Sequence, residues 1–242
     1  MKVLNGFQIK LLALVLMVMD HLYISFPQVF PLWFHPLSRI AAPAFAFLLV
    51  EGFFHTKSKL LYNFRLFSFA IFMMIGNGII NAVLSSKDIY VHNNIFLTLA
   101  LGLTIMNILE ISKTKRGKKK NGLIIAVIIL IALGMFNEGG LVLIPFILIT
   151  YFFRGNRKKE LLGYAVLSIL LFMTNYVAYP TLKETIDMLL FNSDFLFILV
   201  VPFIILYNGQ RGPSSRFAKY LFYIFYPLHL WTLAIIKALL VN

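Results

Sequence analysis

Asp20 and His21 stand side by side within a long apolar segment, residues 7–26, that is built mainly of Leu, Val, Met and Ile. A charged group near the centre of a lipid bilayer costs about 2.5–3.5 kcal/mol on insertion scales. Such residues usually face other helices or a wet cavity, where a carboxylate and an imidazole can pair, relay protons or act as acid and base. This pair is therefore the leading candidate for a functional site.

Two further polar residues lie at comparable depth in other apolar segments. Lys10 marks the start of the first segment, so Asp20 and His21 lie roughly 15 Å further along a helix. Arg39 opens the second segment, and His229 lies in the middle of the last one. We expect the two histidines, the carboxylate and the arginine to converge in the middle and outer half of the bilayer.

Asp20 and His21 are about 100° apart around a helix, so they do not easily form a dyad with each other. We expect Asp20 to pair with Arg39 or with another helix, which leaves His21 for a cavity. The alternative is an Asp20–Arg39 packing clamp, with both histidines bonded to backbone carbonyls. A single buried histidine favours that clamp, whereas a whole cluster at one depth favours a function.

A second group of polar residues lies where segments end on the basic side of the chain. His55 and Thr56 end the second segment, Arg65 opens the third, and residues 207–212 form a turn after the eighth. Two glycines flank polar and basic residues in this turn, so its amides could face an anion. The alternative, a tight turn that carries a topology charge, is favoured by the spacing alone.

The composition identifies the class of protein. Of 242 residues, 60% are hydrophobic and 13% are charged. A soluble domain of this size could not bury so much apolar surface. We expect an all-α integral membrane protein with one domain over residues 1–242 and about nine transmembrane helices. Their approximate ranges are 7–26, 39–54, 63–84, 94–112, 122–136, 138–153, 160–180, 190–207 and 219–240.

The charges predict the orientation. The formal charge of +13 comes from 22 Lys and Arg against 9 Asp and Glu, and the bases concentrate in alternate short loops. They therefore indicate topology and contact with lipid rather than nucleic acid. We expect a cytoplasmic N-terminus in a bacterial plasma membrane. The absence of cysteine excludes disulfides and thiolate metal sites, and no metal is predicted.

Several motifs together are more specific than any of these signals alone. They are LVLMVMDH at 14–21, RIAAPAFAF at 39–47, EGFFHT at 51–56, YNFRL at 62–66, YNGQRG at 207–212 and YLFYIFYPLHL at 220–230. Their order and spacing resemble the TraX family, named for F-pilin acetylation, over nearly the whole chain. The sequence departs from the family pattern at Ser38, where the family has glycine, and residues 110–190 match only in hydropathy.

The resemblance implies transfer of acetyl from cytosolic acetyl-coenzyme A, which for F-pilin goes to the N-terminal amine of the mature subunit. The family is also similar to wider transmembrane acyltransferases that use a histidine within the membrane. His21 corresponds by position to that histidine. The remaining motif positions are occupied by Arg39, Arg65, Asn208, Arg211 and His229.

On the donor side, the phosphates of coenzyme A are too charged to enter the bilayer, so we expect them to dock at the basic cytoplasmic mouth. Arg65, Arg211 and the turn Asn208–Gly212 form the expected cradle, together with His55 and Thr56. The slim pantetheine arm then presents the thioester near mid-depth.

In the centre, His21 is the expected general base for the attacking amine or hydroxyl. A transient acetyl-histidine is an alternative route that the sequence does not separate from direct transfer. His229 or Tyr226 is expected to stabilise the oxyanion or to pass a proton to the leaving thiolate. Asp20 and Arg39 would orient the site or meet the acceptor.

The acceptor stays open at this point, and two other functions remain as alternatives to an acetyltransferase. The acceptor could be a pilin-like peptide, a cell-envelope glycan or a small exported molecule. A proton-coupled secondary transporter also uses Asp, His and Arg at the midplane, although such carriers often show repeated halves and none is evident here. A membrane assembly subunit, whose polar residues only hold helices together, is the third alternative.

Overall fold

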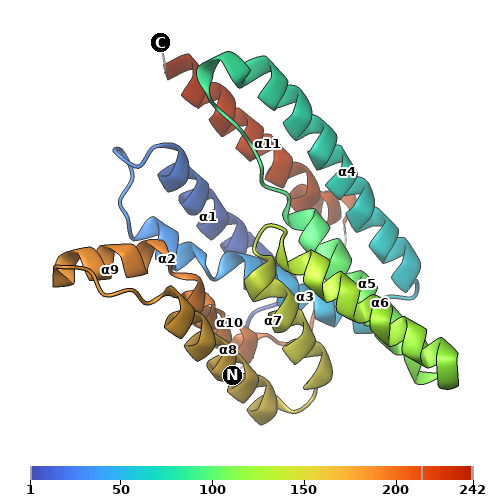
Figure 1. Cartoon of the computed structure of the whole chain (residues 1–242). Coiled ribbons are helices and arrows are strands. Elements are labelled where there is room, and N and C mark those ends of the chain that lie inside the picture. The colour runs from blue at the N-terminus through green and yellow to red at the C-terminus, as the bar shows by residue number, and fades with distance from the viewer. Residues whose placement is uncertain (1, 214, 241–242) are drawn as a thin grey trace. The chain divides into compact units, whose positions relative to one another are not determined.

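The computed structural model describes residues 2–213 and 215–240, and every regular element in this part of the chain is a helix (Figure 1). The α-helices are α1 (Gly6–Ser25), α2 (Phe34–Ser38), α3 (Ala41–His55), α4 (Lys59–Leu84), α5 (Ile95–Lys113), α6 (Gly117–Met135), α7 (Gly140–Phe152), α8 (Arg157–Asn175), α9 (Leu182–Phe191), α10 (Val201–Leu206) and α11 (Arg216–Leu240). Two 3₁₀ helices, η1 (Ser85–Lys87) and η2 (Asp194–Val200), lie between them. The all-α expectation is confirmed.

Within the described residues, five helical stretches are long and apolar enough to cross a membrane. They are Gly6–Ser25, Phe34–His55, Lys59–Lys87, Ile95–Lys113 and Arg216–Leu240. A sixth follows if α9 and the stretch Asp194–Leu206, which are bent by 62° against each other, count as one span. The protein is thus an all-α membrane protein, whereas the expected nine spans are not confirmed. The difference arises because α6 and α8 open with runs of charged residues and α7 has only 13 residues.

Close contacts divide the chain into two compact units that interleave along the sequence. The first unit comprises Met1–Phe45, Gly76–His92 and Leu161–Asn242, and the second comprises Ala46–Ile75 and Asn93–Glu160. The single domain expected over residues 1–242 stays a prediction.

In the first unit, α1 packs against α2 and α11. A capping box starts α1: the Asn5 side chain accepts from the Gln8 amide at 3.0 Å, and the Gln8 side chain accepts from the Asn5 amide at 2.9 Å. The buried face of α1 includes Ile9, Ala13 and His21. This face therefore carries one of the two predicted polar residues into the helix contacts of the unit.

The last part of α4 also belongs to the first unit, where it meets α11. The Trp231 indole nitrogen donates to the Asn77 side-chain oxygen at 2.8 Å. The indole lies so close to Gly76 that a Cβ added there would be 2.1 Å from the ring. The missing side chain of Gly76 therefore allows the indole to pack on the α4 backbone.

The segment that follows α8 differs from the sequence-based expectation. Residues 181–189 were expected to form a loop, but α9 begins there with a capping box. The Thr181 hydroxyl accepts from the Glu184 amide at 3.1 Å, and the Glu184 carboxylate accepts from the Thr181 amide at 3.1 Å. The charged residues Lys183, Glu184 and Asp187 thus belong to a helix, and Glu184 completes its N-terminal cap.

In the second unit, α5, α6 and α7 pack around Ile105, Val127 and Ile144. A Cβ on Gly102 would lie 2.6 Å from the Ile147 side chain, so a small residue allows α5 and α7 to approach each other closely. This unit also contains His55, Thr56 and Arg65, which were predicted to bind acetyl-coenzyme A.

Candidate functional site

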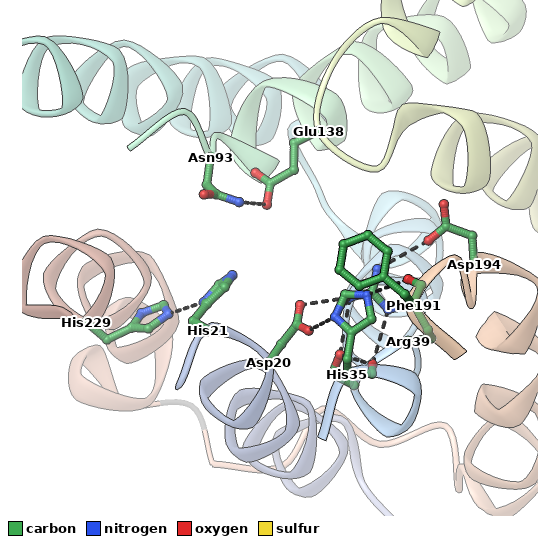
Figure 2. Close-up of polar contacts among 10 residues, drawn as sticks. Asp20, His21, His35, Arg39, Asn93, Glu138, Phe191, Asp194 and His229 are labelled. Carbon is green, nitrogen blue, oxygen red and sulfur yellow. Dashed lines mark hydrogen bonds and ion pairs between the residues drawn. The ribbon is translucent and has the colours of Figure 1, made fainter. Parts of the chain in front are cut away.

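The contact between α1 and α11 brings His21 against His229, although 208 residues separate them in the sequence. Nδ1 of His21 lies 2.7 Å from Nε2 of His229, with the ring centroids 4.9 Å apart and the ring planes inclined by 23° (Figure 2). Both residues were predicted for the site. The structure brings them together as a directly hydrogen-bonded pair of imidazoles.

The bonds of His229 determine where the protons lie when both rings are neutral. Its Nδ1 is 2.9 Å from the Phe225 carbonyl oxygen, which can only accept, so Nδ1 carries the hydrogen. Its Nε2 is then an acceptor, and it receives the hydrogen on Nδ1 of His21. Nε2 of His21 consequently keeps its lone pair, and it makes no hydrogen bond within the described residues.

Aromatic side chains surround the two imidazoles. Tyr226 lies with its ring centroid 6.4 Å from that of His21 and 5.7 Å from that of His229. The Phe225 ring lies nearly parallel to that of His229, with the centroids 5.2 Å apart. His21 and Tyr226 are both buried, at 7% and 4% exposure. The imidazole pair therefore lies in an environment with little water, where hydrogen bonds and charges act strongly.

Asp20, next to His21 in the chain, belongs to a separate polar cluster (Figure 2). Nη2 of Arg39 donates to Oδ2 of Asp20 at 2.8 Å, and Nη1 donates to Asp194 at 3.2 Å. The expected Asp20–Arg39 pair is thus confirmed. The other carboxylate oxygen of Asp20 lies 2.6 Å from Nδ1 of His35. We call Asp20, His35, Arg39 and Asp194 the four-residue cluster.

Both ring nitrogens of His35 face oxygen acceptors, which determines the charge of the cluster. Nε2 lies 2.9 Å from the Phe191 carbonyl oxygen and therefore carries a hydrogen. The short contact with Asp20 then needs one more proton, placed either on Nδ1 or on the carboxylate. The Asp20–His35 pair has no net charge in either arrangement. Because Arg39 and Asp194 also cancel, the four-residue cluster is electroneutral, the state that a low dielectric favours.

His35 and Asp194 were missed by the sequence reasoning. His35 lies in the short helix α2, within residues 27–38 that were expected to form a loop, and Asp194 opens η2. His35 lies outside the predicted spans, and Asp194 lies near the start of the predicted span 190–207 rather than in its middle, so neither carries the signal that singled out Asp20. The only available signal was an isolated histidine among proline and aromatic residues, which does not by itself identify a partner.

The predicted turn at residues 207–212 is present, and it is bound to the start of α1. The Gly6 amide donates to the Gln210 carbonyl at 2.8 Å, and the Phe7 amide donates to the Arg211 carbonyl at 3.1 Å. Gly212 has a φ of 79°, and a Cβ there would lie 2.6 Å from the Asn5 side-chain oxygen. Glycine is therefore required at that position.

Two backbone amides of this turn already donate hydrogen bonds within the chain. The Asn208 amide donates to the Leu4 carbonyl at 2.9 Å, and the Gln210 amide donates to the Asn208 side chain at 2.9 Å. These two amides do not point at a ligand. The exposed side chain of Arg211 is therefore the clearer candidate for holding an anion.

The other residues that were predicted to bind acetyl-coenzyme A lie in the second unit. The His55 ring donates to the Glu51 carbonyl at 2.7 Å, and the Thr56 hydroxyl contacts the Ser58 carbonyl at 3.4 Å. Arg65 is half-buried and forms no ion pair with any described residue. A cradle that joins these residues to Arg211 stays a prediction.

Comparison with known proteins supports the resemblance seen in the motifs. A family model described as TraX protein matches residues 5–237. The probable fimbrial assembly protein FimC, serogroup H1, of Dichelobacter nodosus is 26% identical over 250 aligned positions, which cover 98% of this chain and 97% of that protein. No solved structure matches the chain. With a family match that extends from the α1 cap to the last turns of α11, the chain belongs to the TraX family.

Proposed function

We propose that this protein is a membrane-embedded acetyltransferase that moves acetyl from acetyl-coenzyme A to an acceptor amine, such as the N-terminus of a pilin-like peptide. Family membership and the relative named for fimbrial assembly support a role in pilin modification. The observation that carries the chemistry is Nε2 of His21, a buried imidazole nitrogen with an available lone pair.

In this mechanism, Nε2 of His21 takes the proton from the acceptor amine while the amine nitrogen attacks the thioester carbonyl. The new C–N bond forms, the C–S bond breaks, and the thiolate leaves with the electron pair of that bond. The proton on His21 then passes to the thiolate. If the acetyl group first moves to His21, Nε2 is also the nitrogen that can attack, and both routes use the same ring.

His229 positions His21 for this step. When His21 gains a proton, its Nδ1–H still donates to Nε2 of His229, which is in turn oriented by the Phe225 carbonyl. This series of hydrogen bonds keeps Nε2 of His21 as the reactive nitrogen and stabilises the imidazolium ion. The arrangement serves the same purpose as the orienting third group of hydrolase triads.

The four-residue cluster holds the end of α1 that carries the imidazole. It ties Asp20 to α2 through His35 and to the start of η2 through Arg39 and Asp194. Because the cluster is electroneutral, it can hold this position without leaving an unpaired charge beside the imidazole pair. Asp20 and Arg39 are therefore positioning residues in the proposed mechanism.

Replacement of His21 tests the proposal. Purified protein in lipid, supplied with labelled acetyl-coenzyme A and a peptide with a free N-terminal amine, should acetylate the peptide. His21→Gln should lower this transfer by about 10²–10⁴-fold, the usual contribution of a general base. Mass spectrometry of the peptide measures the product.

His92→Gln is the matched control, because His92 is an exposed histidine of the same unit. It should transfer acetyl like the wild-type protein. Full transfer by His21→Gln would remove the catalytic assignment. Proton-coupled uptake into vesicles without any use of acetyl-coenzyme A would favour the transporter instead.

A further inference from the structure

One end of the first unit combines several bases with no acid. Residues 1–19 and 195–242 contain no Asp or Glu. The segment before α1 is hydrogen-bonded to residues 206–211, so bases from both ends of the chain gather near the start of α1 and of α11. These bases are Lys2, Lys10, Arg211, Arg216 and Lys219. An end of this kind attracts anions.

Lys10 is half-buried on α1, whereas Lys2, Arg211 and Arg216 are exposed. Its ammonium nitrogen lies 5.5 Å from the centre of the Phe222 ring, and Phe7 and Phe45 hold that ring by edge contacts at 5.8 and 5.9 Å. The Phe7 amide donates to the Arg211 carbonyl, so Arg211 lies beside the turn of α1 that precedes Lys10. Lys10 has no hydrogen bond or ion pair with any described residue. An anion between these two cations would relieve their repulsion.

Lys10 also lies on the same face of α1 as the imidazole. Eleven residues separate it from His21, which corresponds to three turns, a rotation offset of only about 20° and a rise of roughly 16 Å. Leu14 and Met17 continue the stripe between them, and both are half-buried. On α11, Phe222 and His229 are likewise two turns apart on one face. Lys10 and the imidazole pair thus lie at two ends of the contact between α1 and α11.

We propose that Lys10 and Arg211 together bind the phosphate nearest the pantetheine arm of the donor, and that the spacing from Lys10 to His21 sets where the thioester stops. From that phosphorus to the sulfur, the arm is a chain of about thirteen bonds, which spans roughly 16 Å when extended at about 1.2 Å per bond. This length matches the rise between the two residues. The assignment rests on the proposed function. It adds Lys10 as the residue that sets how far the thioester of acetyl-coenzyme A reaches along α1.

The test compares three probes that differ in their phosphates. Coenzyme A, 4′-phosphopantetheine and pantetheine are titrated onto the purified protein in discs of uncharged phosphatidylcholine. The wild-type protein should prefer phosphopantetheine over pantetheine. Lys10→Met, which keeps the apolar stem and removes the charge, should reduce that preference about tenfold or more. Lys10→Arg should restore most of it.

Two controls separate this role from a general effect of charge. Lys2→Met removes an exposed lysine at the same end of the unit and should leave the preference unchanged. Arg211→Met should also reduce the preference. Because the Arg211 side chain is exposed, this substitution should leave core packing and folding unchanged. An unchanged preference in Lys10→Met would overturn the assignment of Lys10, and an unchanged preference in Arg211→Met would overturn that of Arg211.

A phosphate on a lipid headgroup has the same chemistry, so the titration is repeated in discs that contain phosphatidylglycerol. If Lys10 holds a lipid, phosphatidylglycerol should raise the melting temperature of the wild-type protein and not that of Lys10→Met, with the preference for phosphopantetheine equal in both. That result would overturn the assignment to the donor.

The proposed function and this inference fail in different ways. His21→Ala should bind coenzyme A like the wild-type protein while losing transfer. A wild-type protein that binds none of the three probes contradicts both proposals. A wild-type protein that binds coenzyme A and transfers acetyl, with no difference in Lys10→Met, contradicts only the role of Lys10.

Discussion

At the scale of single residues, the number of available protons matters as much as the distances. His229 and His35 each donate to a backbone carbonyl, yet their second nitrogens meet different partners. His229 meets a neutral imidazole, so its second nitrogen accepts. His35 meets a carboxylate, so an additional proton must enter the pair. One imidazole thus orients a second imidazole, and the other neutralises a charge.

This difference predicts how the four-residue cluster responds to mutation. His35→Ala should lower the free energy of unfolding by about 3–5 kcal/mol, because it leaves a buried carboxylate with one partner fewer. Asp194→Asn should change it by no more than about 1 kcal/mol, since that side chain is 45% exposed and its contact with Arg39 is long, at 3.2 Å. Denaturation in detergent, followed by circular dichroism, measures both. Equal losses in the two variants would show that the cluster does not depend on the His35 bond.

At the scale of elements, helix pairs place residues that are far apart in the sequence. The contact between α1 and α11 creates the imidazole pair, and the contact between α2 and α9 brings the Phe191 carbonyl to His35. Small residues and helix caps set these contacts. They do no chemistry themselves, so their replacement should affect stability before it affects reactivity.

Gly76 gives a direct test of such a contact. Gly76→Ala should lower the free energy of unfolding by about 1–3 kcal/mol, because a Cβ there would lie 2.1 Å from the Trp231 ring. Gly78→Ala, two residues further along α4, has nothing within 4 Å of its Cβ. It should be neutral or stabilising by up to about 1 kcal/mol. Thermal unfolding of both variants in the same detergent measures the difference, and equal melting temperatures would refute the close packing.

At the scale of the whole molecule, the acid-free basic end of the first unit must face the cytosol if it is to meet acetyl-coenzyme A. The distribution of bases predicts the same orientation. The proposed function and the predicted topology therefore depend on each other.

The chain has no cysteine, so single-cysteine variants can test this orientation. Gln210 in the turn near α11 and Gln28 after α1 are both exposed. A membrane-impermeant maleimide applied to intact cells should label Gln28→Cys, whereas Gln210→Cys should react only after the membrane is permeabilised. The opposite pattern would place the basic end outside, where no acetyl-coenzyme A is available.

Much of this architecture could be predicted because it depends on local sequence. A run of apolar residues must form hydrogen-bonded helices in lipid, and the cost of burying Asp20 and Arg39 predicts that they pair. The helix boundaries were less accurate where charges were ambiguous. Residues 181–189 were expected to form a loop, but the capping box of Thr181 and Glu184 starts α9 there.

The sequence by itself determined the membrane class and the candidates His21, Asp20, Arg39 and His229, because the cost of placing polar groups in lipid depends on residue type and position along a helix. Its motifs, by their resemblance to known proteins, determined the family. Only the tertiary structure decided that the two histidines bond to each other and that His35 and Asp194 complete the second cluster. Hydrogen bonds form between whichever donors and acceptors the packing of distant helices brings within about 3 Å, and no local pattern specifies that choice.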